Sequence, residues 1–252
     1  MDAVTWTLYE GDCLDVMRGM ESESVDAVIT DPPYFLEWKA PINIKGRKSI
    51  FHHKEATEVW DKNNKIQEFY WQLYEVFDRI VNDFGCVVCF VRSEYITYAV
   101  DAAEGNNFDH KATIFWHKTN PVPQVRKRNY LSSVECLVWA TRYDEQKSTY
   151  TFNFSTQKEM HNFIETPICM GKERTNHPAQ KPEKVIEKII KIHTNEGNLI
   201  LDPFAGTGTV LYVAEQINRN SIGIEIDSEY CNIIRKRMDN MQLNLFSMGV
   251  SE

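Results

Sequence analysis

A proline-rich turn near the N-terminus has the residue types needed to hold and aim an exocyclic amine. It reads Asp31-Pro32-Pro33-Tyr34 and directly follows the apolar run Val25–Thr30, which predicts a buried strand. Asp31 offers an acceptor-only carboxylate, the prolines make a rigid loop without N–H groups, and Tyr34 offers an aromatic face for stacking a base. An amine held between Asp31 and the Pro32 carbonyl would donate both hydrogens, and its lone pair would then point at an electrophile.

A glycine-rich turn later in the chain has the features of a nucleoside-binding loop. It lies between a predicted strand and a predicted helix and reads Asp202-Pro203-Phe204-Ala205-Gly206-Thr207-Gly208-Thr209. Glycines let the backbone approach a ligand, and a helix N-terminus offers free N–H groups. The carboxylate of Asp202 suits a cationic ligand group, and Glu225, at the end of the next predicted strand, suits ribose hydroxyls. A positively charged nucleoside such as S-adenosylmethionine meets both requirements.

Simpler interpretations of both turns stay open. Gly206 and Gly208 also match the start of a dinucleotide fingerprint, which would make the chain a nicotinamide oxidoreductase, but Leu211 stands where that fingerprint has its third glycine. Each turn could also be a tight connection that binds no ligand. Two such turns at strand ends, each carrying an aspartate, favour a functional site over two unrelated turns.

Alternating strand and helix patterns position these turns. Buried strands are predicted at 25–30, 86–91, 112–116, 135–140, 198–202 and 221–225, and helices at 66–84, 95–103, 183–193, 210–216 and 228–238. This alternation is typical of an α/β protein with a parallel sheet that is covered on both faces. The carboxyl ends of parallel strands lie along one edge of a sheet, so both turns are expected at that edge.

Length and composition fit an ordinary globular chain. Of the 252 residues, 42% are hydrophobic and 25% are charged. The longest apolar runs are about six residues, whereas a membrane span needs roughly 20. No secretory segment is visible at the N-terminus and the six cysteines are scattered, so a cytoplasmic location with reduced thiols is expected. Cys86 and Cys89 form a C-x-x-C pair on opposite faces of a predicted strand, so no metal site is predicted.

The formal net charge of −8 hides two basic islands. Segments 38–54 and 111–130 carry five cations each and no acidic residue. Clustered cations bind phosphates locally, although such runs are more often solvated loops. The segments 38–65 and 143–175 lack helix or strand periodicity, which favours loops or insertions at the edge of the sheet.

The two turns together resemble the S-adenosylmethionine-dependent amino-methyltransferases of DNA. The turn at 31–34 precedes the turn at 202–209, which is the permuted order of that family's β group, and the small N6-adenine enzymes of restriction–modification systems are the nearest likeness. The resemblance covers nearly the whole chain. It implies a single Rossmann-like, doubly wound domain over 1–252 with a mostly parallel seven-stranded sheet. It also makes 38–65 a mobile basic loop and 119–175 a short target-recognition insertion.

The resemblance further implies roles for individual residues. The catalytic residues would be Asp31, Pro32, Pro33 and Tyr34. The cofactor would contact Asp12, Cys13, Asp31, His177, Gln180, Lys181, Asp202, Phe204, Ala205, Gly206, Thr207, Gly208, Thr209 and Glu225. Phosphates or base edges of DNA would contact Lys39, Lys45, Arg47, Lys48, Lys118, Arg126, Lys127 and Arg128. The sequence departs from the family at Ala179, where threonine is frequent.

These roles imply methyl transfer from S-adenosylmethionine to the N6 amine of an adenine that is flipped out of double-stranded DNA. Asp31 in the first motif position resembles the adenine enzymes, whereas N4-cytosine enzymes more often have serine there. An N4-cytosine enzyme, an RNA adenine methyltransferase and a non-catalytic nucleic-acid-binding subunit remain alternatives. The resemblance extends to a homodimer and a cognate restriction endonuclease as expected partners.

Overall fold

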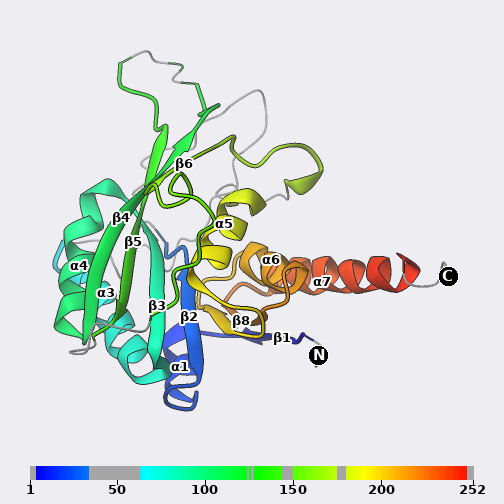
Figure 1. The fold of residues 1–252 in the computed structure, drawn as a ribbon, viewed down its shortest axis with the longest axis horizontal. Coiled ribbons are helices and arrows are strands. Elements are labelled where there is room, and N and C mark those ends of the chain that lie inside the picture. Colours follow the sequence, from blue (N-terminus) through cyan, green and yellow to red (C-terminus); the bar gives the residue numbers. More distant parts are fainter. Residues whose placement is uncertain are drawn as a thin grey trace.

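One mixed sheet forms the centre of the structure, a computed structural model that describes residues 4–33, 63–123, 125, 128–143, 150–174 and 180–248 (Figure 1). Within these residues the sheet has eight strands in the order β1-β8-β7-β2-β3-β5-β4-β6. The strands are β1 (Trp6–Glu10), β2 (Val25–Thr30), β3 (Val81–Val91), β4 (Phe108–Lys118), β5 (Val134–Arg142), β6 (Phe163–Thr166), β7 (Leu199–Asp202) and β8 (Asn220–Glu225).

One strand of this sheet runs against all the others. β5 pairs antiparallel with β3 and with β4, while the remaining neighbours pair in parallel. The N-terminal end of β5 therefore lies at the edge where the other strands have their carboxyl ends. In the observed register Cys136 of β5 lies opposite Val91, and Glu135 lies opposite Trp116.

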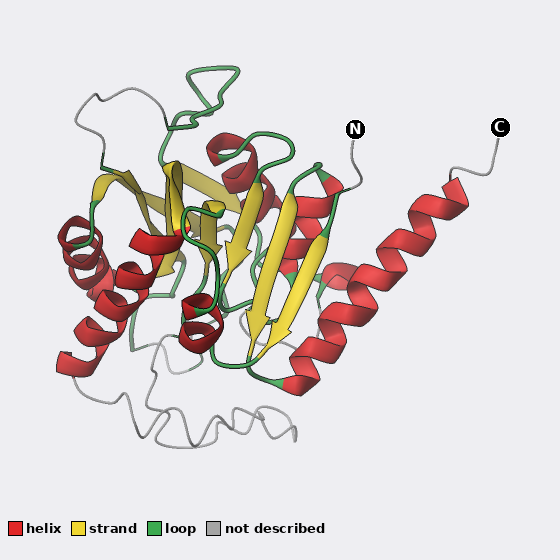
Figure 2. Ribbon diagram, turned by 90° about the horizontal axis from the view of Figure 1, so that it is seen from below, coloured by secondary structure: helices red, strands yellow, loops and turns green. Residues whose placement is uncertain are grey.

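Helices cover both faces of the sheet (Figure 2). The helices are α1 (Cys13–Arg18), α3 (Asn63–Ile80), α4 (Ile96–Gly105), α5 (Glu183–His193), α6 (Thr209–Gln216) and α7 (Ser228–Met248), with short 3₁₀ turns at Ser93–Tyr95 and Gly171–Glu173. Side chains of α1, α3 and α4 form one core, and side chains of α5, α6 and α7 form the other. Among the described helices, none combines the length and the apolar character needed to cross a membrane.

Alternation along the central strands supplies both cores. Val28 of β2 belongs to the core of α1, α3 and α4, while its neighbours Ala27 and Ile29 belong to the core of α5, α6 and α7. β3 alternates in the same way, so Cys86 and Cys89 lie on opposite faces, as predicted. Strand segments buried on both faces are apolar, as at 27–29 of β2 and 86–91 of β3, which is why these two strands are visible in the sequence.

The chain reverses its winding between β2 and β7. From β2 the chain passes through α3 to β3 on one side, and from β7 it passes through α6 to β8 on the other side. β2 and β7 are neighbours in the middle of the sheet. Connections that leave two adjacent strands in opposite directions open a crevice beyond their carboxyl ends, where ligands bind in open α/β sheets.

The predicted α/β fold with a mostly parallel sheet is observed, but the sheet has eight strands rather than seven. The sequence analysis identified neither β1 nor β6, which form the two edges of the sheet. Both are short and mix polar with apolar residues, so they give little periodic signal. Within the segment 119–175, the strands β5 and β6 belong to the sheet, and the role of this segment in target recognition stays a prediction.

Two helix boundaries also differ from the prediction. α3 begins at Asn63, so the last residues of the segment predicted as the basic loop 38–65 are helical, and residues 38–62 lie outside the described residues. α3 ends at Ile80 rather than near residue 84, because Val81 already pairs with Val25 of β2. The final helix continues to Met248, ten residues beyond the predicted end at 238.

Gly223 lets the glycine-rich turn and α6 pack closely against β8. A Cβ atom at this position would lie 2.8 Å and 2.9 Å from the two methyl groups of Leu211 and 3.1 Å from the Cβ of Ala205. Overpacking of this kind costs about 1–3 kcal/mol. We therefore expect Gly223→Ala to lower the free energy of unfolding by about that amount, measured by urea denaturation.

Gly19 provides the matched control for this substitution. It ends α1 in right-handed helical conformation, and the nearest atom to an added Cβ would be 3.4 Å away. Gly19→Ala is expected to change the free energy of unfolding by less than about 0.5 kcal/mol. Equal stability of Gly223→Ala and the native chain would contradict the packing argument.

Candidate active site

The first predicted turn leaves the central strand β2 with its aspartate held by a buried cation. The Nζ of Lys181 contacts Oδ2 of Asp31. Lys181 is only 6% exposed, although it lies just before α5 in a connecting segment. Pro32 is buried and Pro33 is exposed. Asp31 therefore has a fixed cationic neighbour before any substrate arrives.

The same ammonium also contacts a glutamate from the antiparallel strand. Nζ of Lys181 lies 3.1 Å from Oε2 of Glu135, and Oε1 of Glu135 lies 2.7 Å from Nζ of Lys118 at the end of β4. Burial disfavours the charged forms of Lys181 and Glu135, but the oppositely charged groups beside them outweigh this effect. The pKa of Lys181 is raised by Asp31 and Glu135, and the pKa of Glu135 is lowered by Lys181 and Lys118. Lys181 and Glu135 are therefore both ionised at neutral pH.

The second predicted turn leaves β7 directly beside the first. Asp202 is 4% exposed, and its Oδ1 accepts hydrogen bonds from the hydroxyl of Thr30 at 2.9 Å and from the backbone N–H of Phe204 at 3.1 Å. Burial raises the pKa of Asp202 to about 7, although both hydrogen bonds favour the ionised form. A buried carboxylate with this pKa would gain from a cationic ligand group.

The glycine-rich turn needs both of its glycines. Gly206 and Gly208 have φ angles of 54° and 74°, in the left-handed region that residues with a Cβ rarely adopt. Gly208 caps α6, and its N–H donates to the carbonyl of Ala205 at 2.7 Å. Arg237 of α7 supports the turn from outside, since Nη1 lies 3.2 Å from the carbonyl oxygen of Thr207 and 3.3 Å from Oγ1 of Thr209.

Glu225 at the end of β8 joins this turn to the next loop. Its Oε2 accepts from the N–H of Gly206 and its Oε1 from the N–H of Asp227, both at 2.8 Å. Burial raises the pKa of Glu225. The backbone carbonyl of Glu225 also accepts from the N–H of Gly11 at 3.0 Å, which brings the β1 turn to the same edge.

The β1 turn and the segment before α5 complete the edge. Asp12 caps α1 by accepting from the N–H groups of Leu14 and Asp15, and Cys13 is buried behind it. Gln180 donates through Nε2 to the carbonyl of Glu173 at 2.8 Å. Asp12 and Gln180 therefore shape the backbone of their loops in the structure, and their predicted contact with a cofactor remains a prediction.

Some predicted site residues lie outside the described residues, and two of the predicted DNA-binding residues lie within them. Arg128 is exposed, whereas the side chain of Lys118 is 13% exposed and its ammonium is paired with Glu135. The predicted residues outside the described part of the chain are Tyr34, Lys39, Lys45, Arg47, Lys48, Arg126, Lys127 and His177.

Sequence reasoning missed Glu135, Arg237 and Thr30. Glu135 had one visible signal, because it is an acid directly before the apolar run of β5. Nothing in the local sequence marks Arg237, which lies on the long final helix and reaches the turn only through tertiary packing.

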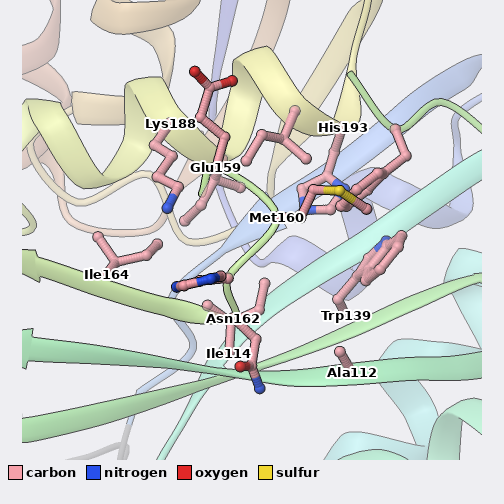
Figure 3. Close-up of a pocket in the computed structure, with 13 residues that line it drawn as sticks. Ala112, Ile114, Trp139, Glu159, Met160, Asn162, Ile164, Lys188 and His193 are labelled. Atoms are coloured by element: carbon pink, nitrogen blue, oxygen red, sulfur yellow. The ribbon is translucent and has the colours of Figure 1, made fainter. Parts of the chain in front are cut away.

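A separate cavity lies between the sheet and α5, away from the strand tips (Figure 3). It is lined mainly by apolar side chains of β4, β5 and α5 and by the segment around Met160. His193 faces it, and burial lowers the pKa of this imidazole to about 3, so the ring is neutral. None of the residues of the two predicted turns lines this cavity, so it is separate from the strand tips.

Comparison with known proteins identifies the family of this chain. A family model described as DNA methylase, of the N6/N4 type, matches residues 25–236. The type II methyltransferase M2.DpnII of Streptococcus pneumoniae is 32% identical over 92% of this chain and 89% of its own, and M.HinfI of Haemophilus influenzae is 28% identical over 94% and 69%.

Solved structures show the same fold. The complex of M1.HpyAVI with SAM superposes with a TM-score of 0.72 at 32% identity, covering 93% of this chain and 99% of that one. The PvuII methyltransferase, described as cytosine-N4-specific, reaches the same TM-score at 18% identity and so supports the fold alone. The chain belongs to the N6/N4 DNA methylase family and is an S-adenosylmethionine-dependent DNA methyltransferase.

Proposed function

We propose that this methyltransferase modifies the exocyclic N6 amine of adenine in double-stranded DNA. The observation that carries the proposal is the pair of adjacent strand tips, with Asp31 after β2 and the cofactor turn after β7, joined by the hydrogen bond from Thr30 to Asp202. Aspartate at the first position of the Asp31–Tyr34 motif favours adenine over cytosine by resemblance to the family. Inside a duplex the N6 amine is unreachable, so the base must be flipped out.

The chemistry that we assign to the first turn is orientation and charge stabilisation. Asp31 and the Pro32 carbonyl would accept the two hydrogens of the amine, so that its lone pair faces the methyl group. As the new N–C bond forms, positive charge develops on the amine nitrogen, and an ionised Asp31 stabilises it. The predicted stacking partner of the base is Tyr34, which lies outside the described residues.

S-adenosylmethionine would supply the methyl group from a sulfonium centre. The residues present suit such a cation, because Asp202 is a buried carboxyl group with a pKa of about 7 and ionises readily at neutral pH. The left-handed glycines bring backbone close to a ligand, and Glu225 and Asp12 border the same edge. We assign the cofactor to this crevice, with Asp202 toward its cationic end and Glu225 toward its ribose.

The remaining expectations complete the proposal. Arg126, Lys127, Arg128 and the basic island at 38–54 would contact DNA phosphates or base edges. A homodimer and a cognate restriction endonuclease follow from the resemblance to restriction–modification enzymes, and a cytoplasmic location follows from the scattered cysteines.

The proposal is tested by transfer of a tritiated methyl group to mixed-sequence duplex DNA, followed by digestion and separation of the nucleosides. Label in N6-methyladenine is the expected result. Label in N4-methylcytosine would overturn the base assignment while keeping the reaction. Label in RNA alone would overturn the choice of polymer.

Asp31→Asn replaces an acceptor oxygen with an amide donor at nearly constant volume. We expect the single-turnover rate of methyl transfer to fall by about 100-fold or more, because a group aimed at developing charge contributes on that scale. The dissociation constant for S-adenosylmethionine, measured by calorimetry, should change by less than about threefold. Asp15→Asn is the control, since Asp15 lies on the surface of α1 with its side chain 77% exposed. A native rate for Asp31→Asn would refute the role of Asp31.

Binding of S-adenosylmethionine is expected to depend on pH through Asp202. Its pKa is about 7 in the free chain, so the carboxyl is mostly protonated at pH 6, and a cationic ligand must displace that proton. Affinity should therefore be about tenfold weaker at pH 6 than at its plateau above pH 8, with proton release on binding. Calorimetry in buffers of different ionisation enthalpy measures both quantities.

Asp202→Asn tests whether this group is the source of the pH dependence. The variant should bind S-adenosylmethionine more weakly at pH 8, and its affinity should no longer change between pH 6 and 8.

Asp202 is also expected to make the stability of the folded chain depend on pH, in the opposite direction from its effect on cofactor binding. The folded chain holds the Asp202 proton more tightly than the unfolded chain does, so this group favours folding at low pH, and its contribution declines as the pH rises from about 4 to 7.

A further inference from the structure

We infer that Glu135 is a positioning residue for methyl transfer, because it holds the ammonium of Lys181 against the catalytic carboxylate of Asp31. The inference rests on the proposed role of Asp31 and adds a residue that the sequence motifs do not contain. It also assigns Lys181 to the catalytic aspartate, whereas the sequence analysis assigned this lysine to the cofactor.

The first step of the argument is the geometry of the contacts. One ammonium, that of Lys181, contacts Oδ2 of Asp31 and lies 3.1 Å from Oε2 of Glu135. It also lies 4.9 Å from the centre of the Phe90 ring, within the range of a cation–π contact. Glu135 is fixed on its other oxygen by Lys118 at 2.7 Å. The four groups form a chain of alternating charge that ends on the catalytic carboxylate.

The second step is burial. The side chains of Lys181, Lys118 and Glu135 are 7%, 13% and 19% exposed, so solvent screens their interactions much less than those of surface ion pairs. These ion pairs join two ammonium groups to two carboxylates, and removing one member takes a counter-ion from a buried charge, which is strongly unfavourable. The position of Lys181 therefore depends on Glu135 as well as on Asp31.

The third step connects these four charged groups to the reaction. Asp31 must present its carboxylate to an amine in one direction, and misplacement by about 1 Å costs on the order of 100-fold in rate. A cation fixed on Oδ2 restrains rotation of the carboxylate and favours its ionised, acceptor-only form. If the second carboxylate were lost, Lys181 would have one anionic partner fewer, and it would lose its proton at a lower pH.

The reversal of β5 explains why Glu135 can reach this place. If β5 ran parallel to its neighbours, its second residue, Glu135, would lie beside their amino-terminal ends. Because β5 runs antiparallel, Glu135 lies opposite Trp116 near the carboxyl end of β4. The strand that breaks the parallel pattern thus brings an acid to the edge where the reaction takes place.

Glu135→Gln tests the inference, since it removes the charge and keeps the volume. In single-turnover methylation of duplex DNA from a preassembled complex, we expect the rate to fall at least about tenfold. The dissociation constants for S-adenosylmethionine and for DNA should stay within about twofold. The alkaline limb of the pH–rate profile should move to lower pH, because Glu135 is one of the two groups that raise the pKa of Lys181.

Two further variants make the result specific. Glu135→Asp keeps the charge and is expected to keep the alkaline limb close to its native position. Glu165→Gln is the matched control and should have the native rate and profile, because Glu165 lies on β6 with its side chain 59% exposed and pairs with His117.

The double variant Lys118→Met with Glu135→Gln covers the case in which the single variant does not fold. It removes one charge of each sign, so the Lys181–Asp31 pair remains and the buried cluster stays neutral. Reduced rate and a shifted alkaline limb in this folded variant would support the inference. A native rate, or a reduced rate with an unshifted limb, in the folded variants would overturn it and make Glu135 a purely structural partner of the lysines.

The result of the Glu135 test can be distinguished from the result of the test of the proposed function. Product analysis of the native chain decides between adenine and cytosine, and the Glu135 comparison then uses whichever product the native chain makes. A failed base assignment therefore leaves the test of Glu135 intact.

Discussion

The parallel pairing of β2 with β7 is the constraint on which the active site depends. These neighbours bring two turns that are 170 residues apart in sequence to one place, and the buried hydrogen bond from Thr30 to Asp202 ties their ends together. The chain leaves the two strands in opposite directions, which is the arrangement beside which open α/β sheets bind ligands. If β2 or β7 shifted by one residue, the side chains of its tip would exchange faces and the carboxylates would separate.

Buried charge is the second theme of the site. Burial raises the pKa of Asp202 to about 7, so this carboxyl is only partly ionised at neutral pH, whereas Lys181 and Glu135 are held ionised by their partners. The two carboxylates at adjacent strand tips thus have different environments. Asp202 is proposed to pair with the cationic group of the cofactor, while Asp31 is already paired with Lys181. This division suits one turn to the cofactor and the other to a neutral amine that becomes positively charged as it reacts.

The sequence was informative where chemistry depends on local motifs and silent where it depends on tertiary contacts. The strands β2, β3 and β7 each contain a short apolar run, and the two turns combine aspartate with proline or glycine, so their place at the strand tips could be predicted. The edge strands β1 and β6 are too short to show a period. Glu135 and Arg237 act on groups distant in sequence, at positions 181 and 207, and only the sheet register and the packing of α7 reveal them.

The antiparallel pairing of β4 with β5 fixes the charged residues at the ends of these strands independently of the segment that connects them. Lys118 ends β4 and Glu135 is the second residue of β5, and the register between these strands fixes both at the base of the connecting segment 119–133. Residues beyond that base can therefore change in length and composition without moving the charges beneath them. Selection could therefore act on this segment independently of the residues that hold Lys181.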